Sequence, residues 1–293
     1  ERRVGSEMCI RDRCNIPEMV VGLTIVAMGT SAPEAAVSIK AALSPEGAGI
    51  TVGNVLGSNI INILVILGVT ALITALPIKK NTLRIDIPFV IAASIMILGM
   101  GYFDGVLSRL EGVIFYIVFI IFLVYLVISA KKGNSESDSI VITEKDKAPR
   151  LILFIIIGLA LVVVGSNFTV NAASYIAGKL GMTERLIGLT IVAFGTSLPE
   201  LVTSIVAARK NEVDMALGNA VGSCIFNILM VLGIASAISP IAFIQENIID
   251  IIVLVVFSLI VWIMAWTKRE IKRGEGIIML LMYAAYTAYI IIR

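Results

Sequence analysis

Histidine is absent from the 293 residues, and cysteines and charged residues are few. Without histidine the chain lacks the side chain best suited to proton transfer near neutral pH. The three cysteines have no paired spacing, so neither a disulfide framework nor a metal knuckle is indicated. Only 15% of the residues are charged and 58% are hydrophobic, whereas about a quarter of a soluble domain is charged. The composition therefore excludes an ordinary soluble globular protein.

Apolar runs of about 20 residues, the length of helix that crosses the hydrocarbon core of a bilayer, recur along the whole chain. Nine spans are predicted, at residues 20–42, 50–77, 85–103, 110–130, 151–178, 186–208, 215–243, 248–266 and 275–292. The fold class that follows is an all-α polytopic membrane protein. An enzyme is not expected, because no histidine is available and the aspartates fall in loops or at helix ends.

The basic residues indicate how the spans are oriented. If the nine spans alternate in direction, 18 of the 23 lysines and arginines fall on one side of the membrane. The positive-inside rule places that side in the cytoplasm. We therefore expect a multi-pass protein of the cell inner (plasma) membrane, with the polar loop 131–149 cytoplasmic and the C-terminus outside. Basic loops at a membrane face need no nucleic-acid partner.

Two phrases occur twice in the chain. The first is GLTIVAMGTSAPE at 22–34 and GLTIVAFGTSLPE at 188–200, identical at 11 of 13 positions. The second is GNVLGSNIINILVILG at 53–68 and GNAVGSCIFNILMVLG at 218–233. We predict a first repeat at 15–130, a linker at 131–149 and a second repeat at 150–293. The copies lie an odd number of spans apart, which predicts inverted repeats with a site at their interface, as in many secondary transporters.

The repeated phrases place an acid and a proline inside apolar spans. A charged carboxylate there costs at least about 2.5 kcal/mol, so the pair Glu34 and Glu200 predicts a central site where the charges are used. Pro33 and Pro199 precede the acids, and proline opens the turn before it and frees carbonyl oxygens. Such broken backbone survives in a membrane only where it is buried in protein or lines a polar cavity.

The remaining polar residues of the phrases supply further oxygen atoms. Hydroxyl or amide oxygens come from Thr30, Ser31, Thr196, Ser197, Ser58, Asn62, Ser223 and Asn227. Asn54 and Asn219 are assigned turn and packing roles. Oxygen ligands suit hard cations such as Ca²⁺, Na⁺ or Mg²⁺, and a nearly dehydrated protein site favours Ca²⁺ over Mg²⁺. One Ca²⁺ or two Na⁺ would balance the two carboxylates, which is a physical basis for exchange.

These phrases resemble the two alpha repeats of the sodium/calcium exchanger (cation/Ca²⁺ exchanger) superfamily, in its prokaryotic form. The resemblance implies ten helices in two inverted halves, four clustered cation sites, and no cofactor or obligate protein partner. It implies that Glu34 and Glu200 hold the central Ca²⁺ with the carbonyls of Thr30 and Thr196. The flanking Na⁺ sites would use Ser31 and Ser58 with the Ala27 carbonyl, and Ser197 and Ser223 with the Ala193 carbonyl. Asn62 and Asn227 would face the middle.

Two features depart from the family pattern. Some relatives have aspartate where this chain has Asn227, which leaves the coupling ion and its stoichiometry open. Residues 1–14, ERRVGSEMCIRDRC, do not match the apolar span that precedes the second copy. We expect that they are not native sequence, and that the first of the ten helices is missing or replaced.

Other couplings also stay open at this point. The closest alternatives are K⁺-dependent Na⁺/Ca²⁺ exchange and Ca²⁺/H⁺ antiport, and an uncoupled cation channel is a third. The lack of histidine disfavours proton coupling, although glutamates can also carry protons. The working prediction is a secondary active antiporter that exchanges Ca²⁺ for Na⁺ by alternating access.

Overall fold

The computed structural model of the chain describes residues 18–43, 48–132 and 184–292, with residues 153, 157–158, 160–161, 164–165, 168, 171–172 and 175–182 between the last two ranges. The predicted non-native segment 1–14 lies outside the described residues, as does almost all of the predicted linker 131–149. The predicted span 151–178 is described only in part. Everything below refers to the described residues.

The order of elements is nearly the same in the two halves of the chain. The first series is α2 (Glu18–Val21), η1 (Gly22–Val26), α3 (Ala27–Thr30), α4 (Ala32–Ala42), α5 (Ala48–Ile60), η2 (Ile61–Ile66), α6 (Leu67–Ile73), β1 (Leu76–Pro77), η3 (Thr82–Asp86), α7 (Ile87–Asp104), β2 (Val106–Leu107) and α8 (Arg109–Lys132). The second is α10 (Glu184–Ile187), η4 (Gly188–Val192), α11 (Ala193–Thr196), α12 (Leu198–Arg209), α13 (Val213–Ile225), η5 (Phe226–Leu232), α14 (Gly233–Ile238), β3 (Ile241–Ala242), α15 (Gln245–Lys268), β4 (Glu270–Ile271) and α16 (Arg273–Ile292). The segments labelled η are π-helical turns, and η3 before α7 has no counterpart before α15.

Eight of the nine predicted spans correspond to helices that are long and apolar enough to cross a membrane. Six are continuous, at Gly49–Ile73, Thr82–Asp104, Arg109–Ser129, Val213–Ile238, Gln245–Lys268 and Arg273–Ile292. The other two are bent, by 48° between Met19–Thr30 and Ala32–Ala42 and by 46° between Leu189–Thr196 and Leu198–Arg209. The chain is therefore a helical membrane protein, as the sequence predicts.

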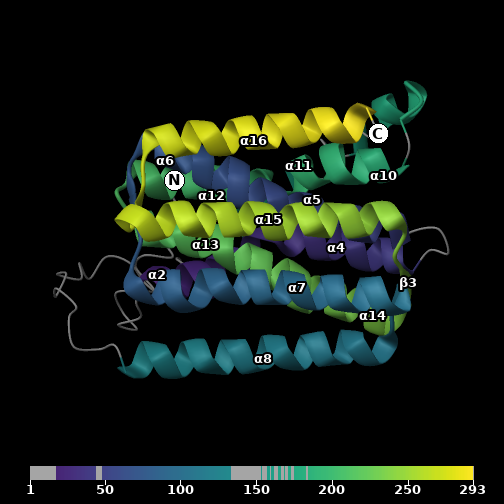
Figure 1. Ribbon diagram of the computed structural model, residues 1–293, viewed down its shortest axis with the longest axis horizontal. Coiled ribbons are helices and arrows are strands. Elements are labelled where there is room, and N and C mark those ends of the chain that lie inside the picture. Colours follow the sequence, from purple (N-terminus) through teal and green to yellow (C-terminus); the bar gives the residue numbers. More distant parts are fainter. Residues whose placement is uncertain are drawn as a thin grey trace.

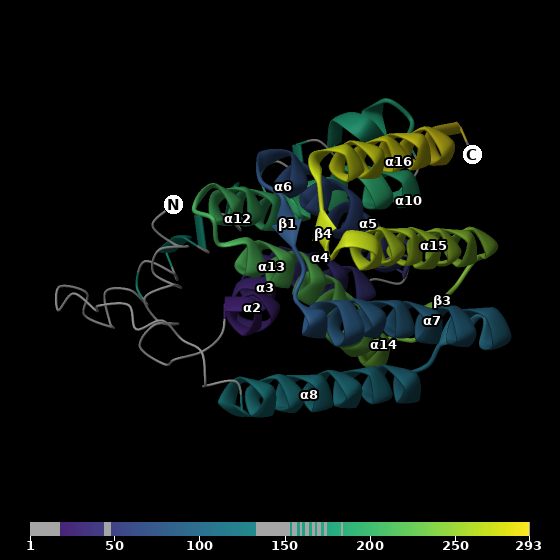
Figure 2. The ribbon, with the colours of Figure 1, turned by 60° about the vertical axis from the view of Figure 1, so that its left-hand side comes forward.

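The two series interlock rather than forming separate bundles. Helix α8 of the first series packs on α14 and η5 of the second, and α16 of the second packs on α6 and η2 of the first. The short strands follow the same rule, because β1 pairs with β4 and β2 pairs with β3, both antiparallel. Figure 1 shows α16, α15, α7 and α8 as a row of long helices, with α4, α5, α12 and α13 behind them. Figure 2 shows β1 and β4 side by side at one end of the helices.

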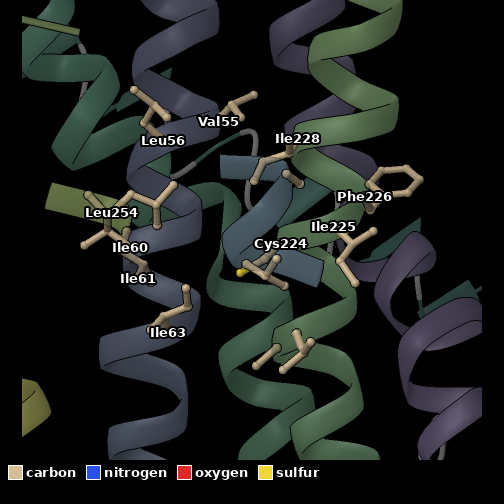
Figure 3. Packing of buried hydrophobic residues seen from close by; sticks show 14 of the residues in the cluster. Val55, Leu56, Ile60, Ile61, Ile63, Cys224, Ile225, Phe226, Ile228 and Leu254 are labelled. Carbon is tan, nitrogen blue, oxygen red and sulfur yellow. The ribbon is translucent and has the colours of Figure 1, made fainter. Parts of the chain in front are cut away.

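The helices in the middle are brought close together by small residues. A β-carbon at Gly57 of α5 would lie 2.7 Å from the Ala193 β-carbon, and one at Gly222 of α13 would lie 2.7 Å from the Leu23 backbone. Such close approach drives helix association in a membrane, where lipid is as apolar as the side chains. Apolar residues such as Val55, Ile60 and Ile225 fill the surroundings (Figure 3).

Candidate cation site

Both bent helices break at a serine that is followed two residues later by proline. Ser31 (φ −82°, ψ 10°) separates α3 from α4, and Ser197 (φ −83°, ψ 2°) separates α11 from α12. Pro33 and Pro199 lie in the first turn of the second helix of each pair, where a missing N–H costs little. Each bend therefore brings a hydroxyl-rich turn to a point buried in the protein.

Each buried acid receives a hydrogen bond from the helix break of the other repeat. The Ser31 Oγ donates to Glu200 Oε1 at 2.7 Å, and the Ser197 Oγ donates to Glu34 Oε1 at 3.2 Å. Both glutamates have no exposed surface. The crossed bonds bring the two acids, 166 residues apart in sequence, to one place in the interior.

Four of the buried residues in the described part of the chain are acidic. The buried acids are Glu34, Asp86, Glu200 and Asp250, and no lysine or arginine is buried among the described residues. Ion pairs such as Lys79 with Asp214, at 2.6 Å, lie at partly exposed side chains. Burying a charge costs free energy unless it is compensated, so a pair of buried carboxylates is an environment that suits a cation or a proton.

Two asparagines brace the acids through their backbone. The Asn54 Nδ2 donates to the Glu34 carbonyl at 3.3 Å and to Ser38 Oγ at 2.9 Å. In the other repeat the Asn219 Nδ2 donates to the Glu200 carbonyl at 3.1 Å and to Ser204 Oγ at 3.0 Å. Both asparagines lie inside helices, so they brace the site and do not form turns.

The threonines of the breaks join the acid-bearing helices to those braces. The Thr30 Oγ1 donates to Asn219 Oδ1 at 3.0 Å, and the Thr196 Oγ1 donates to Asn54 Oδ1 at 3.1 Å. The Ser58 Oγ lies 3.4 Å from Thr196 Oγ1. The network thus repeats across the interface, with a break from one repeat against α5 or α13 of the other.

Several polar atoms at this interface are buried and have no hydrogen-bond partner within the described part of the chain. They are Glu34 Oε2, Asn62 Oδ1 and Nδ2, Ser223 Oγ and Asn227 Oδ1. Asn62 and Asn227 lie in the π-helical turns η2 and η5, a feature frequent at functional sites. Buried polar groups are nearly always satisfied, so these oxygens indicate a ligand. Oxygen-only donors suit a hard cation, and the described residues contain no group of three His, Cys, Asp or Glu that would suit another metal.

Two of the carbonyls that the family resemblance assigns to Na⁺ are already used by the helix. The Ala27 oxygen accepts the Ser31 N–H at 2.9 Å and the Thr30 hydroxyl at 3.2 Å. The Ala193 oxygen accepts the equivalent bonds from Ser197 at 3.0 Å and Thr196 at 3.3 Å. In this conformation a cation would share each of these oxygens with the serine N–H, because the one proton of each threonine hydroxyl has an asparagine oxygen as its nearer side-chain acceptor.

The bracing residues were not predicted as part of the site, although a signal for them exists. Ser38 and Ser204 recur at the same offset as the acids, and Asn54 and Asn219 recur at the offset of the second phrase. A polar residue kept at one position of both copies in an apolar span could have identified them.

Comparison with known proteins assigns the family. The profile described as sodium/calcium exchanger protein matches residues 4–128 and 150–292. The chain is 37% identical to the putative antiporter CaxA of Alkalimonas amylolytica, over 98% of this chain and 92% of that protein. It is 35% identical to the inner membrane protein YrbG of Escherichia coli (strain K12), over 91% and 83%. A solved structure of the sodium-calcium exchanger NCX_Mj, soaked with Na⁺ and Ca²⁺, superposes with a TM-score of 0.81 at 33% identity and covers 98% of this chain and 92% of that one.

The matched residues include both bent helices, both π-helical turns that carry the asparagines, and the interlocked long helices. They therefore cover the whole candidate site. The chain belongs to the sodium/calcium exchanger family.

Proposed function

We propose that the protein is a secondary active antiporter that exchanges Ca²⁺ for Na⁺ through one site at the interface of the two repeats. The observation that carries the proposal is the crossed pair of buried acids, each bonded to the helix break of the other repeat. A site of charge −2 is neutralised by one Ca²⁺ or by two Na⁺, so either load removes the cost of burying the acids.

The proposed ligands are those that the family resemblance implies. Glu34 and Glu200 supply the charge at the centre of the interface. The other proposed ligands are the carbonyls of Thr30 and Thr196, the carbonyls of Ala27 and Ala193, the hydroxyls of Ser31, Ser58, Ser197 and Ser223, and the amide oxygens of Asn62 and Asn227. Ca²⁺ accepts six to eight oxygen ligands in flexible geometry, so a site assembled from four helices suits it.

Alternating access is the proposed mechanism. A fixed ion site is reached from one side of the membrane and then from the other when the surrounding helices move against it. Within the described residues, α8 and α16 lie at the outside of the bundle and expose most of their surface. The close-packed helices around Gly57 and Gly222 support a rigid centre, against which such outer helices would move.

The test of this function is radioactive Ca²⁺ uptake into proteoliposomes preloaded with Na⁺, with K⁺ or with neither, with wild type beside Glu34→Gln and Glu200→Gln. We expect uptake that requires internal Na⁺ and is lost in both variants. Asp104→Asn, which removes an exposed acid at the end of α7, is the control and is expected to match wild type. Uptake that follows K⁺ or a pH gradient instead would overturn Na⁺ as the coupling ion.

We also propose that the protein resides in the cell inner (plasma) membrane with the linker 131–149 in the cytoplasm and the C-terminus outside. The support is the excess of lysine and arginine on one side of the predicted spans. Protease added to right-side-out vesicles is expected to leave the linker intact. Cleavage of the linker under these conditions would show that the orientation is the opposite of the one proposed.

A further inference from the structure

Asn59 and Cys224 occupy the same position in the two copies of the second phrase, 165 residues apart. This is the one position of that 16-residue phrase where an amide in the first copy is replaced in the second. Both residues are fully buried, and each lies three residues before the asparagine that faces the candidate site, Asn62 in the first copy and Asn227 in the second. The difference therefore makes the two halves of the site unequal.

The two residues face each other across the interface. The Asn59 Nδ2 donates to the Cys224 carbonyl at 3.4 Å, and the Cys224 thiol donates to the Asn59 carbonyl at 3.8 Å. Figure 3 shows the Cys224 sulfur directed toward the helix that carries Ile60 and Ile61. Each side chain thus bonds to the backbone of its own counterpart, as expected for positions next to the axis that relates the repeats.

The bond to Cys224 fixes which end of the Asn59 amide faces Asn227. Because Nδ2 is used by the Cys224 carbonyl, the Asn59 Oδ1 is the end that accepts from Asn227 Nδ2, at 3.2 Å. A flipped Asn59 amide would place its oxygen against the Cys224 carbonyl, and two acceptors repel. The Asn227 amide is therefore held by its nitrogen, and its Oδ1 is left buried without a partner in the described residues.

Asn62 has no equivalent support. The Cys224 thiol lies near its amide, but a thiol is only a weak donor and a weak acceptor. Neither polar atom of the Asn62 amide makes a hydrogen bond within the described residues. The contact with the Cys224 thiol, which is weaker than an amide–amide hydrogen bond, is what bears on which end of the Asn62 amide faces the site.

We propose that Asn59 is a positioning residue of the cation site. It fixes the Asn227 amide so that its carbonyl oxygen is presented to the cation. Cys224, at the equivalent position, does not fix the Asn62 amide in this way, so that amide becomes oriented only when the cation binds. The proposal rests on the proposed function, because it takes the Asn227 oxygen as a cation ligand. A ligand that is held in place before binding contributes more to affinity than one that must be ordered during binding. Asn227 therefore contributes more than Asn62 to the affinity for Ca²⁺.

The first test is Asn59→Cys, which introduces the residue already present at the equivalent buried position. We expect the apparent KM for Ca²⁺ in Na⁺-driven uptake to rise roughly tenfold, the equivalent of one net hydrogen bond. The maximal rate and the melting temperature without Ca²⁺ should stay near wild type. An unchanged KM would overturn the proposal, and so would a loss of ion-free stability with no separate effect on KM.

The second test exchanges the two residues in one chain, Asn59→Cys with Cys224→Asn, which moves the support from Asn227 to Asn62. In the wild-type background, Asn227→Ala should raise the KM for Ca²⁺ roughly tenfold more than Asn62→Ala. In the exchanged background, that order should reverse. A purely structural role would not move the sensitivity from one asparagine to the other, so an order that is the same in both backgrounds would contradict the proposal.

Glu34→Gln, measured in the same assay, distinguishes a failure of the proposed exchange function from a failure of the positioning role of Asn59. Uptake that persists in Glu34→Gln would overturn the proposed function itself. Uptake that is lost in Glu34→Gln but has an unchanged KM in Asn59→Cys would overturn only the positioning role.

Discussion

Each buried glutamate accepts one hydrogen bond at its carboxylate and another at its backbone carbonyl. The two bonds fix the position of the carboxylate. For Glu34, a serine of the other repeat bonds to the carboxylate, while Asn54 of its own repeat bonds to the backbone carbonyl. Glu200 has the same pair of contacts, from Ser31 and Asn219. Partners that orient the ligands of a metal site contribute to its affinity, and losing one typically costs about 10- to 100-fold.

A prediction at the residue scale follows for the braces. Asn219→Ala removes the donor to the Glu200 carbonyl and to Ser204, and also the acceptor of the Thr30 hydroxyl. We expect the affinity for Ca²⁺ to fall roughly 10- to 100-fold, as for other second-layer partners of metal sites. Ca²⁺ titration of the purified protein measures this, with Asn81→Ala at an exposed position as the matched control. Equal affinities for the two variants would contradict the bracing role.

Sequence alone predicts the acids and the hydroxyls but not this bracing. The composition of each phrase identifies Glu34 and Thr30 as unusual in an apolar span. The role of Asn54 depends on how α4 packs against α5, which places Ser38 beside it from 16 residues away. That packing is a tertiary property, so a local reading assigns Asn54 to a turn.

At the scale of helices, the site depends on close approach between backbones. Gly57 of α5 packs against the Leu189 carbonyl and the Ala193 side chain, and Gly222 of α13 packs in the same way against Leu23 and Ala27. This contact brings Ser58, next to Gly57 in sequence, within 3.4 Å of the Thr196 hydroxyl at a helix break. Glycine is required here for space, because both positions have ordinary helical backbone.

Gly57→Ala tests this packing. The added β-carbon would lie 2.7 Å from the Ala193 β-carbon and 2.8 Å from the Leu189 carbonyl, so the helices must move apart. We expect a loss of about 1–3 kcal/mol in the free energy of unfolding, with weaker Ca²⁺ binding. Gly99→Ala in α7, where no atom lies within 4 Å of the added carbon, is the matched control. Denaturation in detergent that gives the same stability for both variants would refute the account.

The ends of the helical spans were predicted better than the backbone geometry inside the spans. The prolines and the repeated Gly-Thr-Ser phrase predict two broken spans, and both bends fall there. The π-helical turns at 61–66 and 226–232 were not predicted, because an apolar run has the same pattern whether its hydrogen bonds span four or five residues. The pairs β1–β4 and β2–β3 were not predicted either, since two-residue strands have no periodicity.

At the scale of the whole molecule, the contacts around the two buried acids come from both repeats. The carboxylate of one repeat, the serine of the other and the long outer helices exchanged between them make the halves interdependent. The duplicated phrases predict this interface, because two carboxylates buried in a membrane are costly unless they share a cation or a proton. How the halves interlock depends on the packing of α8 and α16, whose sequences are too uniformly apolar to specify a partner.

The central claim is that Ca²⁺ and Na⁺ compete for the same pair of acids. The measurement that tests it most directly is equilibrium binding of radioactive Ca²⁺ to the purified protein at increasing Na⁺, with wild type and Glu200→Gln in parallel. The account predicts that Na⁺ displaces Ca²⁺ completely, with a dependence on Na⁺ steeper than first order, and that the variant binds little Ca²⁺. Ca²⁺ that stays bound at saturating Na⁺, or that binds equally well to the variant, would contradict it.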